Sequence, residues 1–347
     1  MIRVRELLGG ASPWVIAEIG VNHNGRLSEA LSLVDMAGRC GVQAVKFQAF
    51  RAERLVRRDT PLAAYQARNL GTDPGGQYAM LKSLEIDLPS LAACAGRARE
   101  LGLAFGVTPF DEDSLREILA LEPDFLKIGS GDADNLPLLE AARASDRPVL
   151  VSTGMCDLAD AARIVGCFAG AEAELALLHC VSAYPAPEEA CNLAALASLK
   201  QFGCVTGFSD HTSGRRAAAV ALALGAEILE RHITLDTHAA GPDHACSSDE
   251  VGLREWLAEL QAVRVLLGDG NKRSMPCEED VRRAARKSLL LARPLRAGEP
   301  LRREDVVCLR PADGLPPWRL PDFVGKRAAQ DFEAGRLLQP ADWLEAP

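Results

Sequence analysis

Two lysines interrupt otherwise apolar segments of the sequence and could together hold an anion. Lys46 lies within AVKFQAF, and Lys127 lies within FLKIGS. If these segments are buried strands, both ammonium groups point inward, where each needs a ligand or an oppositely charged partner. The hydroxyl groups that could join them belong to Thr108, Ser130, Ser152 and Ser209. Lysines combined with hydroxyl groups predict a binding site for a small, multiply charged anion, such as a phosphate that also carries a carboxylate.

The same lysines leave a second interpretation open. A lysine in a buried segment can form a Schiff base with a carbonyl substrate, as it does in aldolases built on barrels. The positions of Lys46 and Lys127 in the sequence do not distinguish this covalent role from the binding of an anion. The two interpretations differ in outcome, because borohydride traps only a Schiff base.

Two histidines could bind a metal ion. His211 lies in GFSDHT and His232 in ERHIT, within two consecutive apolar segments. Two imidazoles leave positions on a divalent ion open for water or substrate. Such a weak, exchangeable site fits Mn²⁺ or Mg²⁺ better than a structural Zn²⁺. A pair of structural histidines, one of them in a network with Asp210, is the alternative that the spacing alone leaves open.

The elements that must position these residues follow one rhythm over residues 1–270. Short apolar runs rich in β-branched residues alternate with segments of helical periodicity. We count about eight runs, the number that closes a (β/α)8 TIM barrel. They begin at Val15, Ala44, Ala104, Phe125, Pro148, Leu175, Val205 and Ile228. A doubly wound open sheet is the competing α/β arrangement, but no G-x-G-x-x-G sequence follows the first run.

Polar residues recur towards the C-terminal ends of these runs. In a TIM barrel these ends face one opening, where the active site lies. A single serine or threonine there often only caps the following helix. Two lysines, two histidines and a glutamate are harder to explain without a ligand, because buried unpaired charges are costly. We therefore expect an active site that includes Glu18, Lys46, Thr108, Lys127, Ser130, Ser152, Ser182, His211 and His232.

The chain divides into three parts. Residues 1–270 form the predicted barrel, and the charged, glycine-containing stretch 271–285 is a predicted linker. Residues 286–347 contain a weak internal repeat, AGEPLRREDVV from Ala297 and AGRLLQPADWL from Ala334. We expect this part to be a small domain of turns and short strands, marginally stable alone and docked on another surface.

Composition limits the partners of the chain. A formal net charge of −9 and a pI near 5.3 argue against nucleic acid, because a phosphate backbone needs a basic surface. Ten scattered cysteines without a C-x-x-C pair indicate reduced thiols. The N-terminus lacks the apolar region of a signal peptide, and no run approaches the ~18 apolar residues of a membrane helix. We expect a cytoplasmic protein with no membrane partner.

Taken together, the motifs resemble those of the sialic acid synthase family, which comprises the N-acetylneuraminate synthases and their legionaminate, pseudaminate and spore-coat polysaccharide relatives. The resemblance rests on the ordered set AEIGVNHNG, VKFQAF, GVTPFDEDS, FLKIGSGD, VSTGM, GFSDHT, ERHIT and GPD. The C-terminal part resembles the antifreeze-like (SAF) domain of that family. The resemblance implies a metal-dependent condensation of phosphoenolpyruvate with N-acetylmannosamine or a related acetamido hexose. The products would be a nine-carbon sugar acid and phosphate.

Carried over position by position, the resemblance also implies a role for each residue. The metal ligands are His211 and His232. The contacts to phosphoenolpyruvate are Lys46, Thr108, Lys127, Ser130, Ser152, Ser182 and Ser209. The amino-sugar site is lined by Gln48, Asp132, Tyr184 and Asp243, and Glu18 lies beside the reacting carbon. Arg310 reaches the barrel of the partner subunit in a domain-swapped homodimer.

Two positions depart from the pattern of the family. Ser182 stands where N-acetylneuraminate synthases often carry asparagine, and Asp132 stands where they carry glutamate. Serine keeps a hydroxyl for the anion, whereas aspartate is one methylene shorter and changes the reach towards the sugar. The resemblance implies a non-phosphorylated amino sugar as the acceptor, and the shorter Asp132 leaves the choice between N-acetylmannosamine and a 2,4-diacetamido hexose open.

Two other functions stay open at this point. Another phosphoenolpyruvate-dependent synthase, of seven- or eight-carbon sugar acids, could use the same barrel. Those enzymes are not expected to carry the C-terminal domain. A non-enzymatic sugar-binding protein is the other alternative, and it would not need the complete set of lysines and histidines.

Overall fold

The chain forms two compact units, residues 1–268 and residues 269–347. The computed structural model describes residues 3–10, 13–71, 74–171 and 174–344. The first unit contains the lysines and histidines singled out above, and the second contains Arg310.

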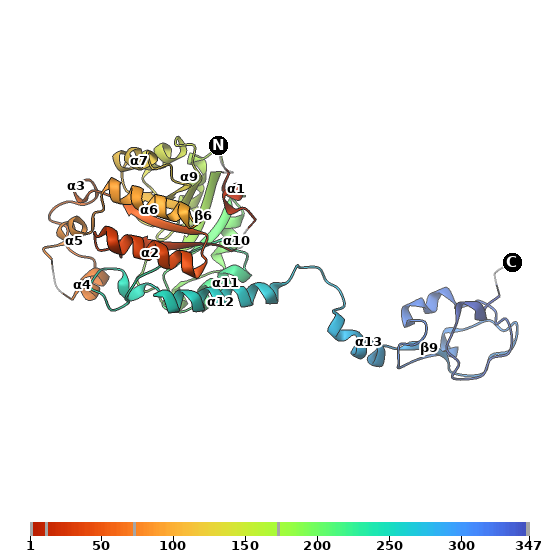
Figure 1. The fold of residues 1–347 in the computed structure, drawn as a ribbon. Helices are drawn as coiled ribbons and strands as arrows, with labels where there is room; N and C mark the ends of the chain where they lie inside the picture. Colours follow the sequence, from red (N-terminus) through yellow and green to blue (C-terminus); the bar gives the residue numbers. More distant parts are fainter. Residues whose placement is uncertain (1–2, 11–12, 72–73, 172–173, 345–347) are drawn as a thin grey trace. The chain divides into compact units, whose positions relative to one another are not determined.

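The first unit, coloured from red to cyan in Figure 1, is a closed barrel of eight parallel strands that follow one another around the ring in chain order. This confirms the predicted (β/α)8 TIM barrel. The strands are β1 (Trp14–Gly20), β2 (Ala44–Ala49), β3 (Ala104–Pro109), β4 (Phe125–Ile128), β5 (Val149–Ser152), β6 (Leu175–Cys180), β7 (Val205–Asp210) and β8 (Ile228–His232). Because β1 pairs with β8 as well as with β2, the sheet closes on itself.

Helices alternate with the strands and pack on the outside of the barrel. They are α2 (Leu27–Cys40), α6 (Leu88–Glu100), α7 (Glu112–Leu119), α8 (Leu136–Arg143), α9 (Leu158–Cys167), α10 (Ala195–Lys200), α11 (Arg216–Ala223) and α12 (Glu250–Leu267). Several begin at an aspartate whose side chain accepts a hydrogen bond from a backbone N–H of the first turn, namely Asp87, Asp111, Asp157 and Asp249. In the described ranges no helix is long and apolar enough to cross a membrane.

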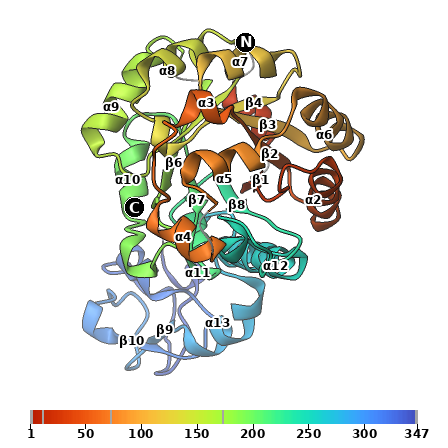
Figure 2. The ribbon, with the colours of Figure 1, turned by 90° about the vertical axis from the view of Figure 1, so that its left-hand side faces the viewer.

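The connection between β2 and α6 adds short helices at one end of the barrel. These are α3 (Ala52–Leu55), α4 (Ala64–Leu70) and α5 (Gln77–Leu84), and Figure 2 shows them in front of the ring of strands. An apolar cluster fastens this connection to the barrel and is formed by Val21, Phe50, Met80 and Leu84. The covered end is the one at which the strands finish, since α3 begins shortly after the last residue of β2.

The opposite end of the barrel is apolar and closed. Helix α1 (Val4–Leu8) packs its buried residues against the first inward-facing residues of the strands, including Trp14 and Phe125. The rings of Trp14 and Phe125 meet edge to face, with centroids 5.4 Å apart. This layer excludes water from beneath the polar residues that follow it along each strand.

Side chains alternate along each strand, so residues two positions apart face the same side of the sheet. The inward-facing series therefore changes from apolar to polar as each strand proceeds. Ile16 is followed by Glu18, Ala44 by Lys46, Phe125 by Lys127, Leu150 by Ser152, and Ile228 by Glu230. The barrel interior thus carries an apolar layer near the start of the strands and a charged layer near their ends.

The second unit is small and built from turns. Strands β9 (Ser288–Leu291) and β10 (Val306–Leu309) form an antiparallel pair, and helix α13 (Glu279–Ala285) precedes them. Helix α13 lies within the stretch 271–285 that the sequence suggests as a linker. The core of this unit is formed by side chains such as Leu289, Leu301, Phe323, Phe332 and Trp343.

The internal repeat predicted from the sequence corresponds to a repeated structure. Asp305 and Asp342 are buried at equivalent positions, and each accepts a hydrogen bond from the backbone N–H three residues earlier. Each also pairs with an arginine, Arg293 at 2.6 Å and Arg336 at 2.7 Å. The acidic residue of each repeat therefore closes a turn, which explains why both copies keep it.

Gly106 generates the first testable prediction, because a methyl group at this inward-facing position of β3 would collide with the ring of Phe125. We predict that Gly106→Ala lowers the free energy of unfolding of the barrel by about 1–3 kcal/mol, the usual cost of overpacking a core. Urea unfolding followed by circular dichroism measures this change. Gly96→Ala in α6 is the control, because a Cβ there meets nothing within 4 Å. Equal losses in the two variants would contradict this description of the interior.

Candidate active site

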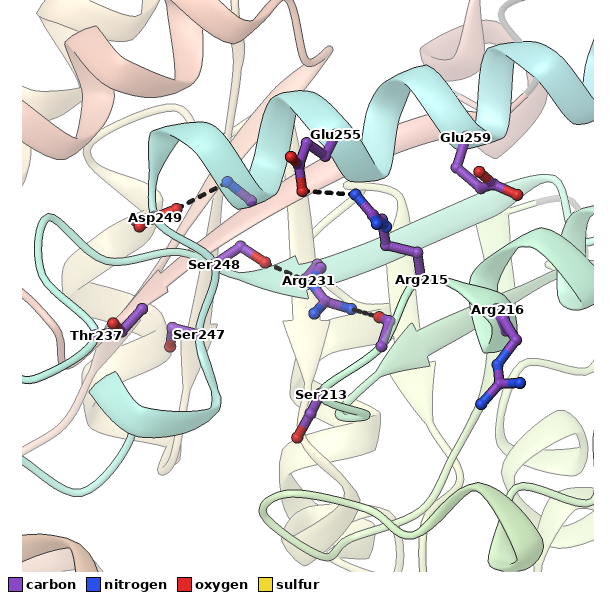
Figure 3. Close-up of a pocket in the computed structure, with 12 residues that line it drawn as sticks. Ser213, Arg215, Arg216, Arg231, Thr237, Ser247, Ser248, Asp249, Glu255 and Glu259 are labelled. Carbon is purple, nitrogen blue, oxygen red and sulfur yellow. Dashed lines mark hydrogen bonds and ion pairs between the residues drawn. The ribbon is translucent and has the colours of Figure 1, made fainter.

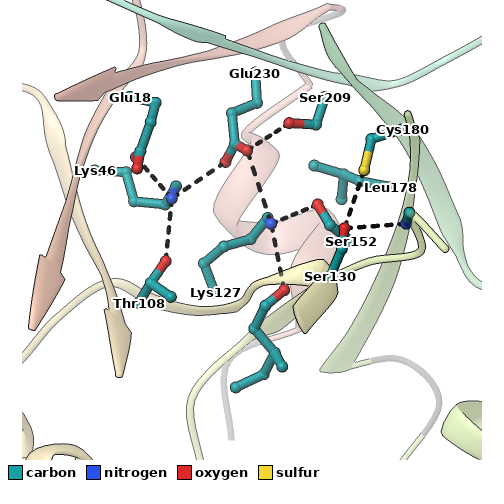
Figure 4. Close-up of polar contacts among 12 residues, drawn as sticks. Glu18, Lys46, Thr108, Lys127, Ser130, Ser152, Leu178, Cys180, Ser209 and Glu230 are labelled. Carbon is teal, nitrogen blue, oxygen red and sulfur yellow. Dashed lines mark hydrogen bonds and ion pairs between the residues drawn. The ribbon is translucent and has the colours of Figure 1, made fainter. Parts of the chain in front are cut away.

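Four charged side chains lie together inside the barrel, near the carboxyl ends of their strands (Figure 4). They are Glu18 of β1, Lys46 of β2, Lys127 of β4 and Glu230 of β8, and none is more than 4% exposed. Charges can be buried in this way when they compensate one another and have hydrogen-bonding partners. Here two positive and two negative groups share one space.

Lys46 is held by two carboxylates and a hydroxyl group. Its Nζ lies 2.6 Å from Oε2 of Glu18 and 3.8 Å from Oε2 of Glu230, and it donates a hydrogen bond to Oγ1 of Thr108 at 3.0 Å. Strand pairing places Glu18 directly beside Lys46. Burial alone would lower the pKa of Lys46, but the two carboxylates raise it above its usual value. Lys46 is therefore a stable cation.

Lys127 is less well compensated. Its Nζ donates to Oγ of Ser152 at 2.5 Å and to the carbonyl oxygen of Ile128 at 3.3 Å, and it lies 3.7 Å from Oε1 of Glu230. Burial lowers the pKa of Lys127, an effect that Glu230 opposes and Lys46 reinforces. An anion bound beside Lys127 would favour its charged form. Because its pKa is lowered, an anionic ligand would stabilise the charged form of Lys127 more than that of Lys46.

Glu230 lies between the two lysines, and the sequence reasoning above misses it. Its Oε1 also accepts a hydrogen bond from Oγ of Ser209 at 2.7 Å. Burial would raise the pKa of Glu230, but Lys127 and Lys46 lower it to about 2, so it is a permanent anion. A signal for it exists in the sequence, because Glu230 stands two positions before His232 and hence on the same face of β8.

Glu18 differs from Glu230 in its readiness to take up a proton. Burial raises the pKa of Glu18, Lys46 opposes this rise, and Glu230 adds to it. The side chain of Gln48 donates a hydrogen bond to Oε1 of Glu18 at 3.1 Å. The two carboxyl groups thus divide their roles, since one stays ionised and the other can exchange a proton.

Serine hydroxyl groups gather around the backbone of Gly154, on the side of Lys127. Oγ of Ser130 accepts a hydrogen bond from the N–H of Gly154 at 3.0 Å and lies 3.1 Å from Sγ of Cys180. A side chain at position 154 would collide with Oγ of Ser182. Glycine there lets the chain approach these groups closely, and the hydroxyl and N–H groups are donors that suit an anion.

His211 and His232 lie side by side where β7 and β8 end, with ring centroids 5.7 Å apart. Nδ1 of His211 donates to the carbonyl oxygen of Val181 at 2.8 Å, so its lone pair is on Nε2, which lies 3.5 Å from Oγ of Ser209. Burial lowers the pKa of both histidines, so both are neutral at pH 7, as metal ligands must be. Asp210, the alternative partner for His211, instead pairs with Arg231 at 2.7 Å.

The two imidazoles fit a divalent metal ion with open positions. Nδ1 of His232 is buried and has no hydrogen-bonding partner among the described residues. In the same part of the chain, no third histidine, cysteine, aspartate or glutamate completes a metal-binding cluster. A metal ion held here would therefore keep several positions for water or substrate.

Tyr184 and Asp243 border the histidines. The ring of Tyr184 lies 4.3 Å from that of His211 and meets the ring of His232 edge to face at 6.0 Å. Asp243 is 8% exposed, and within the described ranges no group donates a hydrogen bond to its carboxylate. Burial, together with the charge of Glu18, raises the pKa of Asp243 to about 7.

Asp132 and Arg310 are the predicted site residues that remain to be described, and Arg310 belongs to the second unit. Asp132 is half-buried at the end of the short 3-10 helix η1 (Ser130–Asp132), where it accepts a hydrogen bond from Asn135 at 3.0 Å. Arg310 follows β10 in the second unit and is exposed. Their roles at the site stay predictions.

A cavity of about 580 Å³ lies between α12 and the segments that follow β7 and β8 (Figure 3). None of the predicted site residues lines it. Its arginines are paired, Arg231 with Asp210 at 2.7 Å and Arg215 with Glu255 at 2.5 Å. Because these charges are already compensated, we assign the chemistry to the network inside the barrel.

Comparison with known proteins agrees with this geometry. Residues 33–272 match the NeuB family, and residues 286–343 match the SAF domain. An N,N'-diacetyllegionaminic acid synthase of Legionella pneumophila is 37% identical over 331 residues, which cover 94% of this chain and 93% of that protein.

Two solved structures are also similar to this chain. A putative spore coat polysaccharide biosynthesis protein E from Chromobacterium violaceum has a TM-score of 0.83 at 25% identity, covering 95% of this chain and 99% of its own. An N-acetylneuraminic acid synthetase from Leptospira borgpetersenii has a TM-score of 0.69 at 30% identity, covering 78% of this chain and 90% of its own.

The raised pKa of Asp243 predicts a pH-dependent stability. Its folded pKa of about 7 exceeds the ordinary 3.8, so its favourable contribution is complete below pH ~4 and is lost as the pH rises through 7. Asp243→Asn removes this loss. The variant should therefore be more stable than the wild type at pH ~8, by roughly 2–4 kcal/mol, and about equally stable at pH ~4. Urea unfolding of the ligand-free protein measures both differences, and a less stable variant at the higher pH would refute an unpaired carboxylate.

Proposed function

The chain belongs to the NeuB family, and we propose that it condenses phosphoenolpyruvate with an amino sugar, releasing phosphate and forming a nine-carbon sialic-acid-like sugar acid. The observation that carries this proposal is the pair of buried lysines, Lys46 and Lys127, held around Glu230 beside several serine hydroxyl groups. Such a set suits a small ligand with both a carboxylate and a phosphate. The SAF domain favours this family over synthases of seven- or eight-carbon sugar acids.

The acceptor that we propose is a non-phosphorylated acetamido hexose. Identity of 37% to an N,N'-diacetyllegionaminic acid synthase supports a 2,4-diacetamido hexose over N-acetylmannosamine. No described residue donates a hydrogen bond to the carboxylate of Asp243, which supports an acceptor that can donate an N–H or O–H hydrogen bond. Phosphoenolpyruvate is a cytoplasmic metabolite, so we expect the reaction to take place in the cytoplasm.

His211 and His232 would hold the divalent cofactor, for which we propose Mn²⁺ or Mg²⁺. Their neutral rings and the unpartnered Nδ1 of His232 support this assignment. When bound, the ion would supply Lewis-acid polarisation of the sugar aldehyde. The ring of Tyr184 packs against both histidines and holds them in place.

The charged layer of the barrel provides the remaining chemistry. A bond forms between C3 of phosphoenolpyruvate and the aldehyde carbon, and the aldehyde oxygen takes up a proton to become a hydroxyl. A water oxygen adds at C2 and gives up one proton. The bond from C2 to the phosphate oxygen then breaks, which leaves a keto group at C2, and the second proton of the water leaves with phosphate. Lys46 and Lys127 hold the two anionic groups and stabilise the charge that leaves with phosphate. Glu18 takes the proton from the attacking water, because its raised pKa suits it to proton exchange.

Phosphate release tests this proposal directly. With Mn²⁺ and phosphoenolpyruvate, the wild-type enzyme should release phosphate in the presence of an acetamido hexose, and mass spectrometry should detect the nine-carbon acid. EDTA should abolish the activity, Mn²⁺ should restore it, and His232→Ala should not respond to added metal. Lys127→Ala should raise the KM for phosphoenolpyruvate by roughly 30- to 150-fold, since a buried charge-assisted contact contributes about 2–3 kcal/mol. Lys272→Ala is the matched control, because Lys272 is an exposed lysine of the second unit.

Each alternative has its own signature in these assays. Full turnover of metal-free enzyme would refute the role of the metal ion. Borohydride trapping at Lys46 or Lys127 would instead support a Schiff base. A marked preference for the 6-phosphorylated sugar would refute the proposed acceptor, and sugar binding without phosphate release would indicate a non-enzymatic protein.

We propose further that the chain acts as a domain-swapped homodimer, in which Arg310 of one subunit completes the sugar site of the other. The resemblance of the LRP segment to the family supports this role, as does the exposure of Arg310 in its own unit. Within the described residues Arg310 forms no ion pair, so its guanidinium group is free to bind a ligand.

Subunit complementation tests the role of Arg310. Arg310→Ala and His232→Ala homodimers should each be nearly inactive. If Arg310 acts across the dimer, a mixed dimer has one complete site, because the intact His232 faces the intact Arg310. Mixing should then restore up to about half of the activity per dimer. Differently tagged subunits confirm that mixed dimers have formed, and no recovery in them would rule out the shared site.

A further inference from the structure

Tyr65 extends the row of aromatic rings that begins at the histidine pair. It lies in α4, part of the connection that covers the mouth of the barrel. Its ring centroid is 5.1 Å from that of Tyr184, at an interplanar angle of 30°. The other side of this row is the contact of Tyr184 with His211 at 4.3 Å. The row therefore runs from the proposed metal ligands to α4.

Hydrogen bonds fix α4 against the segment that carries Asp243. Nδ2 of Asn69 donates to the carbonyl oxygen of Pro242 at 2.6 Å, and Pro242 directly precedes Asp243. The start of α4 is fixed as well, because Oε1 of Gln66 accepts a hydrogen bond from the backbone N–H of Ala63 at 2.9 Å. The position of Tyr65 is thus set by the same loop as that of Asp243.

Asp243 indicates that a hydrogen-bond donor belongs at this place. Its carboxylate is buried and receives no hydrogen bond from the described residues, which is costly unless a ligand supplies a donor. The phenol groups of Tyr65 and Tyr184 both interact electrostatically with the carboxylate of Asp243. Burial raises the pKa of Tyr65 and of Tyr184, and the charge of Asp243 raises both further. The stacking of Tyr65 on Tyr184 and the hydrogen bond from Asn69 of α4 to Pro242 place both tyrosines in the neighbourhood of Asp243.

We propose that Tyr65 is a specificity-determining residue, which contacts the end of the acceptor sugar remote from its aldehyde while Asp243 accepts an N–H or O–H of that end. This inference rests on the proposed condensation. The aldehyde belongs at His211 and His232, and Tyr184 separates these from Tyr65. An acetamido methyl group packs well on an aromatic face. The second acetamido group of a 2,4-diacetamido hexose is the group that we place against the ring of Tyr65.

The KM values of the two substrates test this role. Tyr65→Ala should raise the KM for a 2,4-diacetamido hexose about tenfold or more, because a full aromatic contact is lost. The KM for phosphoenolpyruvate should stay unchanged, and the preference for the diacetamido sugar over N-acetylmannosamine should fall. Tyr65→Phe keeps the ring and should lose only about threefold. Tyr78→Ala is the matched control, because Tyr78 is half-buried in the same connection but lies under Arg58.

Three outcomes would overturn the inference. If the wild type releases phosphate with an acetamido sugar and Tyr65→Ala changes neither the acceptor KM nor the preference, the inference fails while the proposed function stands. Equal losses with both sugars, together with a raised KM for phosphoenolpyruvate, would make Tyr65 a merely structural residue of α4. If none of the acetamido sugars leads the wild type to release phosphate, the proposed condensation fails, and the acceptor role of Tyr65 fails with it.

Discussion

Charges buried inside a closed barrel have to compensate one another, and Glu230 is the group through which this protein meets that requirement. Its carboxylate lies 3.7 Å from Lys127 and 3.8 Å from Lys46, whereas Glu18 pairs with Lys46 alone. Without Glu230, two ammonium groups would share one carboxylate in a space that water barely reaches, at a cost of several kcal/mol. The two ammonium groups and the two carboxylates balance, so the charge of a bound anion has to be offset by a further proton or a cation.

The rest of the barrel supports this charged layer through the simplest property of a strand, its period of two. The same inward-facing positions that carry charge near the mouth carry apolar groups one step earlier, so the ions rest on Trp14, Ile16 and Phe125. Gly106 contributes by having no side chain, which leaves room for the ring of Phe125 beneath Lys46 and Lys127. Dense packing under the lysines keeps their ammonium groups at fixed positions, which a preorganised anion site needs.

Much of this arrangement can be predicted from the sequence, because each strand is a short apolar run. A lysine within such a run can face only one of the two sides of the sheet. Glu230 is harder to find, since it stands in a charged stretch next to Arg231, which faces the opposite way and binds Asp210. Only the fold decides which of two adjacent charges points inward. Tyr65 is harder still, because it lies in an ordinary polar helix and its partner Tyr184 comes from the far side of the ring.

Helix α1 and the apolar layer close the barrel where the strands begin, so we expect molecules to reach the lysines from the other end, where the tyrosine rings lie. In the proposed reaction, phosphoenolpyruvate would then have to bind before the sugar fills the space beside Tyr184, and phosphate would leave only after the sugar acid. The depth of the anion site would thus impose an order of binding. An excess of the sugar would then inhibit the reaction, because a sugar that binds first would block the access of phosphoenolpyruvate to Lys46 and Lys127.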